Sequence, residues 1–502
     1  MEGHSHVELK LIPIRKRSLA GALVAVLCAA ASGCASAGRA APAPSRPPNI
    51  VFIMADDLGY GDVGAFGQTK IGTPRLDAMA REGTRFTRFY AGSPVCAPSR
   101  STLMTGENTG HTPIRGNREV LPIGQWPLPD SAVTLAEVLK ARGYATGAFG
   151  KWGLGGPGSE GVPTKQGFDE FFGYLDQRRA HFYYPEFLFR GEERVALPNR
   201  VSEAPNSPGA GPAIVRGKYS QDAIADEALS FIDRHRDEPF FLYLPFTIPH
   251  AELDPPPDAF APYLRPEGSS VFPETPFPGA HYGAQAMPHA AYAAMVTRLD
   301  RDVGRVLDRL KELGLDGNTI VIFTSDNGPS VEGGSDPDFF DSNGPFRGHK
   351  RDVYEGGIRE PMIVRWPGQV PAGRVSDHRW AMWDVLPTLA HLAGARAPRG
   401  IDGLDMAAAL TARGAAPEHD QLYWEFHEQG GKQGLIRGEW KVVRLNLIRN
   451  ADAPVELYDL AHDPGERHDV AAQHPDVVRE MKEIMVREHT DSQTFPDLND
   501  VR

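Results

Sequence analysis

The feature of this sequence that most constrains its fold is a regular alternation of short apolar runs with longer amphipathic segments. The runs are rich in β-branched and aromatic residues, which is typical of strands buried on both faces of a parallel sheet. The segments between them have helical periodicity, and one of them has Thr73-Pro74 as a start and Gly83 as a stop. Strands that alternate with helices predict an α/β layered fold with a largely parallel sheet.

The pattern divides the chain into two parts. In the first part the predicted strands cover residues 49–54, 144–150, 240–246, 319–324 and 361–366, and the predicted helices cover residues 131–142, 219–236, 290–313 and 384–393. Later strands at residues 421–427, 434–445 and 455–460 are joined by polar turns and followed by a helix at 475–489. This predicts a main domain over residues 49–412 and a small C-terminal α+β domain with an antiparallel sheet over residues 413–502.

Polar side chains come directly after four of the predicted strands. They are Asp56 with Asp57, Lys151, His250, and Asp326 with Asn327. In open α/β sheets the ligand crevice lies outside the carboxyl ends of the strands, so we expect these side chains to meet at one edge.

Asp56, Asp57, Asp326 and Asn327 are all potential oxygen ligands of a metal ion. Adjacent carboxylates repel one another unless a cation or a proton intervenes, and oxygen donors favour Ca²⁺ or Mg²⁺ over zinc. Each pair alone would also suit an ordinary turn or helix cap.

The first 34 residues are typical of an export signal rather than of a folded domain. A basic cluster at residues 15–17 precedes an apolar stretch at 18–31 that is too short for a membrane anchor. Residues 31–34 resemble a bacterial lipoprotein box that would lipidate Cys34, whereas residues 35–37 would suit a plain cleavage site. We therefore expect an exported protein, periplasmic or on the outer surface and attached to the membrane if Cys34 is lipidated, with a linker over residues 35–48.

Cys96 is the only cysteine of the three outside this leader. Exported proteins usually pair their cysteines, so an unpaired one is either a small buried hydrophobe or a chemical group. Pro98 and Gly106 stand where a helix could begin and end, which would place Cys96 at a helix N-terminus that favours anions. Arg100, about one turn further on, would supply a cation to the same site. These neighbours favour a chemical role for Cys96.

The stretch Cys96-Ala97-Pro98-Ser99-Arg100, with Thr105-Gly106 after it, resembles the signature of the type I sulfatases, arylsulfatase-like members of the alkaline phosphatase superfamily. Similar stretches follow the family order: NIVFIMADDLGYGD at residues 49–62, Gly150-Lys151-Trp152, Pro249-His250, SDNG at residues 325–328, and Lys350 with YEGGIREP at residues 354–361. The resemblance runs from about residue 49 to the C-terminal helix. It implies an alkaline-phosphatase-like sandwich with a mostly parallel central sheet, flanking helices and a smaller C-terminal domain.

The resemblance also implies an activity, the hydrolysis of carbohydrate or aryl sulfate monoesters to an alcohol and inorganic sulfate. In this family a maturation enzyme converts the signature cysteine to formylglycine. The hydrated aldehyde, a gem-diol, is the nucleophile and gives a sulfo-enzyme intermediate. Its second hydroxyl then allows sulfate to leave, whereas a plain serine would keep a stable ester.

Carried over position by position, the resemblance implies a role for each motif residue. The metal, usually Ca²⁺ with Mg²⁺ as an alternative, would be held by Asp56, Asp57, modified Cys96, Asp326 and Asn327. Arg100 would hold the formylglycine, Lys151 and Lys350 would bind sulfate oxygens, and His250, together with Lys350, would be the candidate general acid.

One position departs from the family pattern. The second motif of the family usually reads Lys-x-His, and that histidine assists regeneration of the aldehyde. Here the sequence is Lys151-Trp152-Gly153, so the histidine is missing. Our hypothesis is that His181, in the aromatic stretch at residues 179–184, lies near the site and takes part of this role. The alternative is a surface or packing histidine.

Two other functions compete with the sulfatase interpretation. A phosphonate or phosphate ester hydrolase of the same superfamily would usually carry His where Asn327 stands, so Asn327 favours the sulfatase. A non-catalytic protein that binds sulfated glycans at the cell surface would explain Gly153, but the otherwise intact set of motif residues argues against it. The net charge of −12, without a long basic run after the N-terminus, argues against nucleic acid as a partner.

Overall fold

The computed structural model describes residues 46–450 and 452–499. The predicted signal peptide over residues 1–34, the predicted lipidation site at Cys34 and residues 35–45 of the predicted linker lie outside the described residues. Within the described ranges, every helix is too short or too polar to cross a lipid bilayer.

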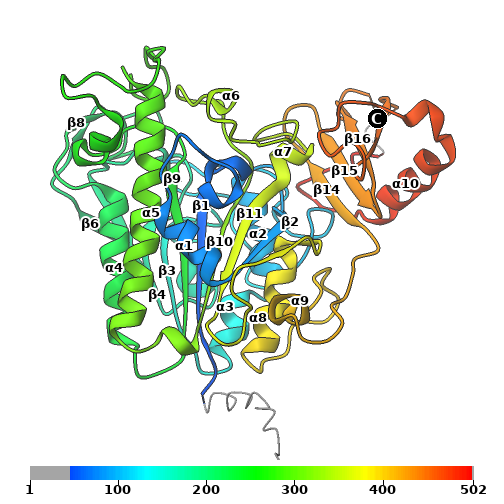
Figure 1. Cartoon of the computed structure of the whole chain (residues 1–502), viewed down its shortest axis with the longest axis horizontal. Helices are drawn as coiled ribbons and strands as arrows, with labels where there is room; N and C mark the ends of the chain where they lie inside the picture. Colours follow the sequence, from blue (N-terminus) through cyan, green and yellow to red (C-terminus); the bar gives the residue numbers. More distant parts are fainter. Residues whose placement is uncertain (1–45, 451, 500–502) are drawn as a thin grey trace, which may run out of the picture. The chain divides into compact units, whose positions relative to one another are not determined.

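A large sheet forms the centre of the fold, and β1 (Asn49–Asp56) lies in its middle (Figure 1). β1 pairs in parallel with β9 (Phe240–Pro249) on one side and with β10 (Thr319–Ser325) on the other. β3 (Ala145–Lys151) continues the parallel arrangement beside β9, whereas β11 (Arg359–Arg365) runs antiparallel to β10. The sheet is therefore mostly parallel, as the sequence predicts.

The full strand order is β12-β2-β11-β10-β1-β9-β3-β4-β5-β6, with β13 also paired to β2. The strands outside the centre are β2 (Thr84–Tyr90), β4 (Glu170–Tyr174), β5 (Phe187–Arg190), β6 (Glu193–Ala196), β12 (Arg374–Ser376) and β13 (Trp380–Ala381). A separate ribbon pairs β7 (Arg200–Val201) with β8 (Ala213–Val215).

Helices cover both faces of this sheet, because alternate residues of each buried strand point to opposite sides. From β1, the side chains of Val51 and Ile53 pack in one core with α1 (Pro74–Glu82), α4 (Ser220–Arg234) and α5 (Pro288–Glu312). Ile50 and Phe52 pack in a second core with the helices of the other face: α2 (Cys96–Thr105), α3 (Leu135–Lys140), α8 (Val385–Leu392) and α9 (Ala407–Thr411). Because the helices cover the two faces of the sheet, the polar residues lie at the carboxyl ends of its strands.

A second, antiparallel sheet follows in the order β14 (Leu422–Phe426), β15 (Lys432–Arg437), β16 (Trp440–Leu445) and β17 (Val455–Asp459). Its one face packs on α10 (Pro475–Arg487) (Figure 1). Its other face packs on the main part of the protein, where Phe426 and Val443 share a small core with Cys96. The antiparallel sheet was predicted, whereas the domain boundary at residues 412 and 413 stays a prediction.

The structure corrects two predicted elements. The strand predicted over residues 434–445 is two strands, β15 and β16, because Gly438 adopts a left-handed conformation (φ 55°) and reverses the chain. The helix predicted over residues 131–142 is shorter, since Thr134 caps its start by accepting a hydrogen bond from the backbone N–H of Glu137. The short helices α6 (Pro337–Phe340) and α7 (Glu355–Ile358) were not predicted.

Candidate active site

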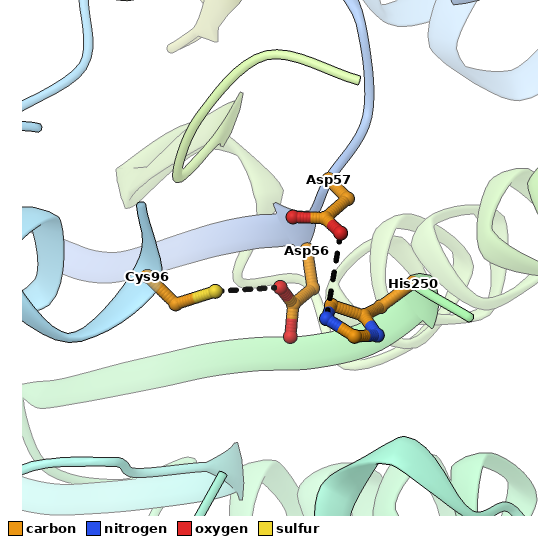
Figure 2. Close-up of side chains that lie close together, drawn as sticks. All are labelled: Asp56, Asp57, Cys96 and His250. Carbon is orange, nitrogen blue, oxygen red and sulfur yellow. Dashed lines mark hydrogen bonds and ion pairs between the residues drawn. The ribbon is translucent and has the colours of Figure 1, made fainter. Parts of the chain in front are cut away.

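Polar side chains from four strands meet at one edge of the central sheet. Asp56 is the last residue of β1, Lys151 the last residue of β3, His250 follows β9 and Asp326 follows β10. These strands are neighbours and run in parallel, so their carboxyl ends lie along the same edge. All four side chains are buried. Figure 2 shows Cys96, from the start of α2, meeting Asp56, Asp57 and His250 at this place.

Asp57 is a buried carboxylate held by two donors. Its backbone is left-handed (φ 63°), which turns the chain directly after β1. Its Oδ1 accepts a hydrogen bond from Asn327 Nδ2 at 2.8 Å, and its Oδ2 accepts one from Lys350 Nζ at 2.8 Å. Burial raises the pKa of Asp57, but His250, when protonated, and the Lys350 ammonium outweigh burial and lower the pKa below its ordinary value. Asp57 is therefore ionised.

Asp56 is also ionised, and cations surround it. Lys151 Nζ lies 2.6 Å from Asp56 Oδ2, and Arg100 Nη2 lies 3.4 Å from the same oxygen. Burial raises the pKa of Asp56, but Lys151 above all, together with His250, Arg100 and Lys350, holds it well below its ordinary value. Each of the two adjacent carboxylates thus has its own lysine, as mutual repulsion requires.

Cys96 is the first residue of α2, and its Sγ lies 3.5 Å from Asp56 Oδ1. Gly106 ends this helix in a left-handed conformation (φ 73°), at the position that the sequence suggested. Burial raises the pKa of the Cys96 thiol well above its usual range. A protonated thiol is a poor nucleophile, so the unmodified side chain is unsuited to thiolate chemistry.

Arg100 is fully buried one turn into α2 and ties three elements together. Its Nη1 donates to the backbone carbonyl of Lys151 at 2.6 Å, and its Nη2 donates to Asp326 Oδ2 at 2.7 Å. Burial raises the pKa of Asp326 to about 6, and the charge of Asp56 adds to this effect. Arg100 therefore fixes α2, and with it residue 96, against the ends of β3 and β10.

His250 and Lys350 form a pair that could hold a mobile proton. His250 Nδ1 donates to the backbone carbonyl of Ala251, which leaves Nε2 as the acceptor nitrogen of a neutral ring. Lys350 Nζ lies 3.0 Å from this Nε2. Burial lowers the pKa of His250, and the Lys350 ammonium lowers it further, although Asp57 opposes both effects. If one of these two side chains gives its proton to a substrate, the other can replace that proton.

His181 lies in the site, as the hypothesis about Gly153 requires. Its ring stacks on the ring of His250, with centroids 4.5 Å apart and 13° between the planes. Its Nδ1 is buried and has no hydrogen-bond partner among the described residues. Burial lowers the pKa of His181 well below its ordinary value, and the neighbouring His250 and Lys151 add to this shift. The ring is therefore neutral, and His181, which is partly buried, lines the cavity of the site.

The donor set suits a divalent cation. Asp56, Asp57, Cys96 and His250 each offer one ligand atom, and these atoms lie within 4.8 Å of one another. In addition, Asn327 Oδ1 is buried without a hydrogen-bond partner in the described part of the chain. A buried amide oxygen without a donor is costly, and a hard cation would satisfy it. Asp326, a predicted ligand, is engaged by Arg100 and does not belong to the four-residue group.

A cavity of 520 Å³ opens onto these residues, and Cys96, His181, His250 and Lys350 line it. Its other lining residues were not predicted from the sequence. The charged ones are Arg118, Glu119, Arg178, Glu332, Arg351 and Glu428, and the uncharged ones are Asn117, Gln125, Gln177, His281 and Tyr282. Most of them lie on loops and do not directly follow a predicted strand, so the rule that located the other site residues does not apply to them. The Pro-rich segment at residues 255–288 was a signal for His281 and Tyr282, because long irregular segments often carry function.

Two family profiles match this chain. The profile described as Sulfatase matches residues 48–395, and that described as N-sulphoglucosamine sulphohydrolase, C-terminal, matches residues 346–491. The first match alone covers more than half of the chain. The chain belongs to the sulfatase family. This sulfatase is therefore a sulfuric ester hydrolase that acts on sulfate monoesters, and the resemblance stated from its motifs is confirmed.

Relatives of known activity agree with this assignment. N-acetylgalactosamine-6-sulfatase of Canis lupus familiaris is 36% identical over 75% of this chain and 68% of its own length. Arylsulfatase A of Homo sapiens is 33% identical over 88% of both chains. The crystal structure of Ps i-CgsB in complex with k-i-k-neocarrahexaose superposes with a TM-score of 0.71 and 30% identity, over 88% of this chain and 93% of that one. Sulfatases of this family generally use formylglycine and a divalent metal, and the buried acidic group of this sulfatase could bind such a metal.

Proposed function

We propose that this sulfatase hydrolyses sulfate esters of carbohydrates, with formylglycine at position 96 and Ca²⁺ as its cofactors. The observation that carries the proposal is the position of Cys96. Its buried, protonated thiol lies 3.5 Å from Asp56 Oδ1, and Cys96 lines the cavity together with Lys350 and His250. A protonated thiol is a poor nucleophile. An aldehyde on Cβ of residue 96 would, once hydrated, present two hydroxyl groups, and one of them could attack sulfur.

Each buried side chain has a task in sulfate ester hydrolysis. The metal, held by Asp56, Asp57, residue 96, Asp326 and Asn327, would supply positive charge to the attacking and transferring oxygens. Lys350, which lines the cavity, would bind a sulfate oxygen. Lys151 lies behind Asp56 and keeps it ionised, and it would reach the sulfate only if it left that carboxylate. The His250–Lys350 pair would give a proton to the departing alcohol oxygen.

The cavity favours a sugar over an aryl or steroid group. Among its lining residues, Tyr282 is the only one with a carbocyclic ring, and no aliphatic side chain is present. Carboxylates, guanidinium groups and amides suit the hydroxyl groups of a carbohydrate, whereas a flat apolar group would leave them without partners. Two of the compared proteins, the N-acetylgalactosamine-6-sulfatase and the structure with k-i-k-neocarrahexaose, carry carbohydrates in their names.

The predicted export signal adds a cellular location to the proposal, and Cys96 adds a maturation enzyme as a partner. The export signal over residues 1–34 would take the chain to the periplasm or the outer surface, with Cys34 as the lipid attachment site. A formylglycine-generating enzyme would have to convert Cys96, because the buried thiol is protonated and a protonated thiol is a poor nucleophile. At the surface, a sulfated glycan polymer is the substrate that such an enzyme would meet.

Mass spectrometry of the tryptic fragment that contains residue 96 tests the proposal, together with turnover assays. The protein is produced in a host with a demonstrated maturation system and assayed with Ca²⁺. The substrates are sulfated galactosamine and glucosamine, an aryl sulfate and an aryl phosphonate. We expect conversion of Cys96 to the aldehyde and a kcat/KM that is highest for a sugar sulfate. Preference for the phosphonate would favour the rival ester hydrolase, and binding of sulfated sugars by fully converted protein without any turnover would favour a glycan-binding protein.

A further inference from the structure

A hydrogen-bond chain outside the family motifs reaches the start of the nucleophile helix. Asn117 Oδ1 accepts the backbone N–H of Ala97 at 3.1 Å, and Ala97 is the neighbour of Cys96 in the first turn of α2. Gln177 Nε2 donates to the same oxygen at 3.0 Å. Asn117 and Gln177 both line the cavity with Cys96.

The orientation of the Asn117 amide follows from these two contacts. A backbone N–H can only donate, so the atom of Asn117 that faces Ala97 must be its oxygen. That oxygen then receives the Gln177 amide as its second donor, and the Nδ2 group must point away from both. Nδ2 has no hydrogen-bond partner among the described residues, although the side chain lies at the cavity.

The backbone of Asn117 is held as firmly as its side chain. Its N–H donates to Glu428 Oε1 at 2.6 Å, and Glu428 comes from the segment that follows β14 of the C-terminal sheet. Asn117 is thus fixed by three contacts from three separate segments. An amide held in this way is a preorganised donor, and it needs no rearrangement when charge develops nearby.

Gln177 occupies the space next to the position where the family motif is broken. Gly153 has a left-handed backbone (φ 77°), and a Cβ placed there would lie 3.1 Å from Gln177 Nε2 and 3.3 Å from its Cγ. A side chain at residue 153 and the Gln177 amide would therefore compete for the same volume. The glycine in Lys151-Trp152-Gly153 lets the Gln177 side chain reach Asn117.

We propose that Asn117 donates a hydrogen bond from its Nδ2 to an oxygen of the transferring sulfate group, and that Gln177 is the positioning residue that orients this amide. The inference rests on the proposed function and deepens it, because it assigns a donor and its support at the reacting centre. His181, which lies on the His250 side of the cavity, keeps its separate predicted role.

Five variants test the inference, with turnover of a sulfate ester and binding of inorganic sulfate as the two readouts. Asn117→Asp keeps the shape and replaces the donor by an acceptor, so we expect kcat/KM to fall about 100-fold. Gln177→Met keeps the volume beside Gly153 and removes the donor, and we expect a loss of about 10-fold. In an Asn117→Ala background, Gln177→Met should cause no further loss of kcat/KM, because Gln177 acts only through the Asn117 amide. Gln166→Met is the matched control, since Gln166 is also buried but donates to backbone carbonyls such as that of Glu160.

The sulfate readout does not need turnover. Sulfate should raise the melting temperature of the wild-type protein and of Gln166→Met, and the shift should shrink for Asn117→Asp and Gln177→Met. The fraction of residue 96 that is converted is measured in every variant, so that loss of maturation is not mistaken for loss of catalysis. Wild-type kcat/KM and sulfate affinity in Asn117→Asp, or full additivity of Gln177→Met with Asn117→Ala, would overturn the inference. If the wild-type protein were inactive although its Cys96 was fully converted to formylglycine, the proposed function itself would be wrong.

Discussion

His181 stacks face to face on His250, and the two rings lie 4.5 Å apart although residue 181 belongs to no sulfatase motif of the sequence. The stacking places a neutral imidazole, with an unpartnered Nδ1 among the described residues, beside the residue that we expect to serve the leaving group. A neutral imidazole has a free nitrogen that can accept a proton during the reaction, although the lowered pKa of His181 makes it a weaker base than an exposed histidine. Accepting a proton is the task of the histidine that position 153 lacks.

We therefore expect His181→Ala to lower kcat about 100-fold, a typical contribution of one general base. The covalent sulfo-enzyme should accumulate, because its breakdown needs the proton acceptor more than its formation does. Rapid quenching and intact-mass analysis would measure the accumulated fraction. His289→Ala is the control, since His289 is also stacked, at 4.0 Å on Phe339, but does not line the cavity. Unchanged turnover in His181→Ala would show that His181 only packs against His250.

The Cys96→Ser variant separates formation of the covalent intermediate from its breakdown. A serine hydroxyl at the start of α2 can attack sulfur, but its ester has no second hydroxyl to expel sulfate. We expect one turnover at most and a stable mass increase of one SO₃ group on the fragment that contains residue 96. Cys96→Ala should show neither. Repeated turnover by Cys96→Ser would mean that a different group attacks sulfur.

The centre of the fold and the sheet edge where the polar side chains meet could be predicted because both depend on local pattern. The apolar run at residues 50–55 suits a strand in the middle of a parallel sheet, and the polar residues that follow it then lie at the sheet edge. The same logic located Lys151, His250 and Asp326. Cys96 was found through its unusual chemistry as a lone cysteine before Pro98 and Arg100.

The cavity wall could not be predicted, because tertiary packing alone brings its residues together. Asn117 lies in a loop, and it meets Gln177 60 residues later and Glu428 311 residues later in the chain. Nothing in the local sequence distinguishes these polar residues from ordinary loop residues. Likewise, the pairing of Arg100 with Asp326 depends on the packing of α2 against β10 and has no local sequence signal. This pairing engages a carboxylate that was predicted as a metal ligand, so the ligand set of the metal stays a prediction.

Removal of the carboxylate of Asp57 should abolish binding of Ca²⁺. Asp57→Asn retains the shape but loses the charge that Lys350 and the expected metal share, so we expect activity to fall at least about 1,000-fold. Ca²⁺ should raise the melting temperature of the wild-type protein, whereas it should leave that of Asp57→Asn unchanged. Asp237→Asn, at a fully exposed site, is the control for a general charge effect. If Ca²⁺ stabilised Asp57→Asn as well as the wild-type protein, the metal would bind elsewhere.

The stability of the contact between the main part of the protein and the C-terminal sheet should depend on pH through Glu425. This buried carboxylate accepts hydrogen bonds from Arg115 at 2.8 Å, His427 at 2.9 Å and His489 at 2.8 Å. Burial raises the pKa of Glu425, but the two histidines and Arg115 outweigh it and lower the pKa from 4.5 to about 2. The unfolded chain therefore binds the proton first, and the stabilisation by Glu425 is present above pH 4.5 and lost as the pH falls toward 2.

His489 contributes with the opposite sign. The hydrogen bond to Glu425 raises its pKa above 6.5, so its stabilisation is present below pH 6.5 and lost as the pH rises through the folded-state pKa. Glu425→Gln should accordingly destabilise the protein most between pH 4.5 and 6.5, by about 3 kcal/mol, and less at either side. Urea unfolding at a series of pH values measures this difference. Glu480→Gln, on an exposed pair with Arg437, should change stability by less than about 0.5 kcal/mol at every pH. A constant difference across the pH series for Glu425→Gln would mean that the lost stability is packing and not charge.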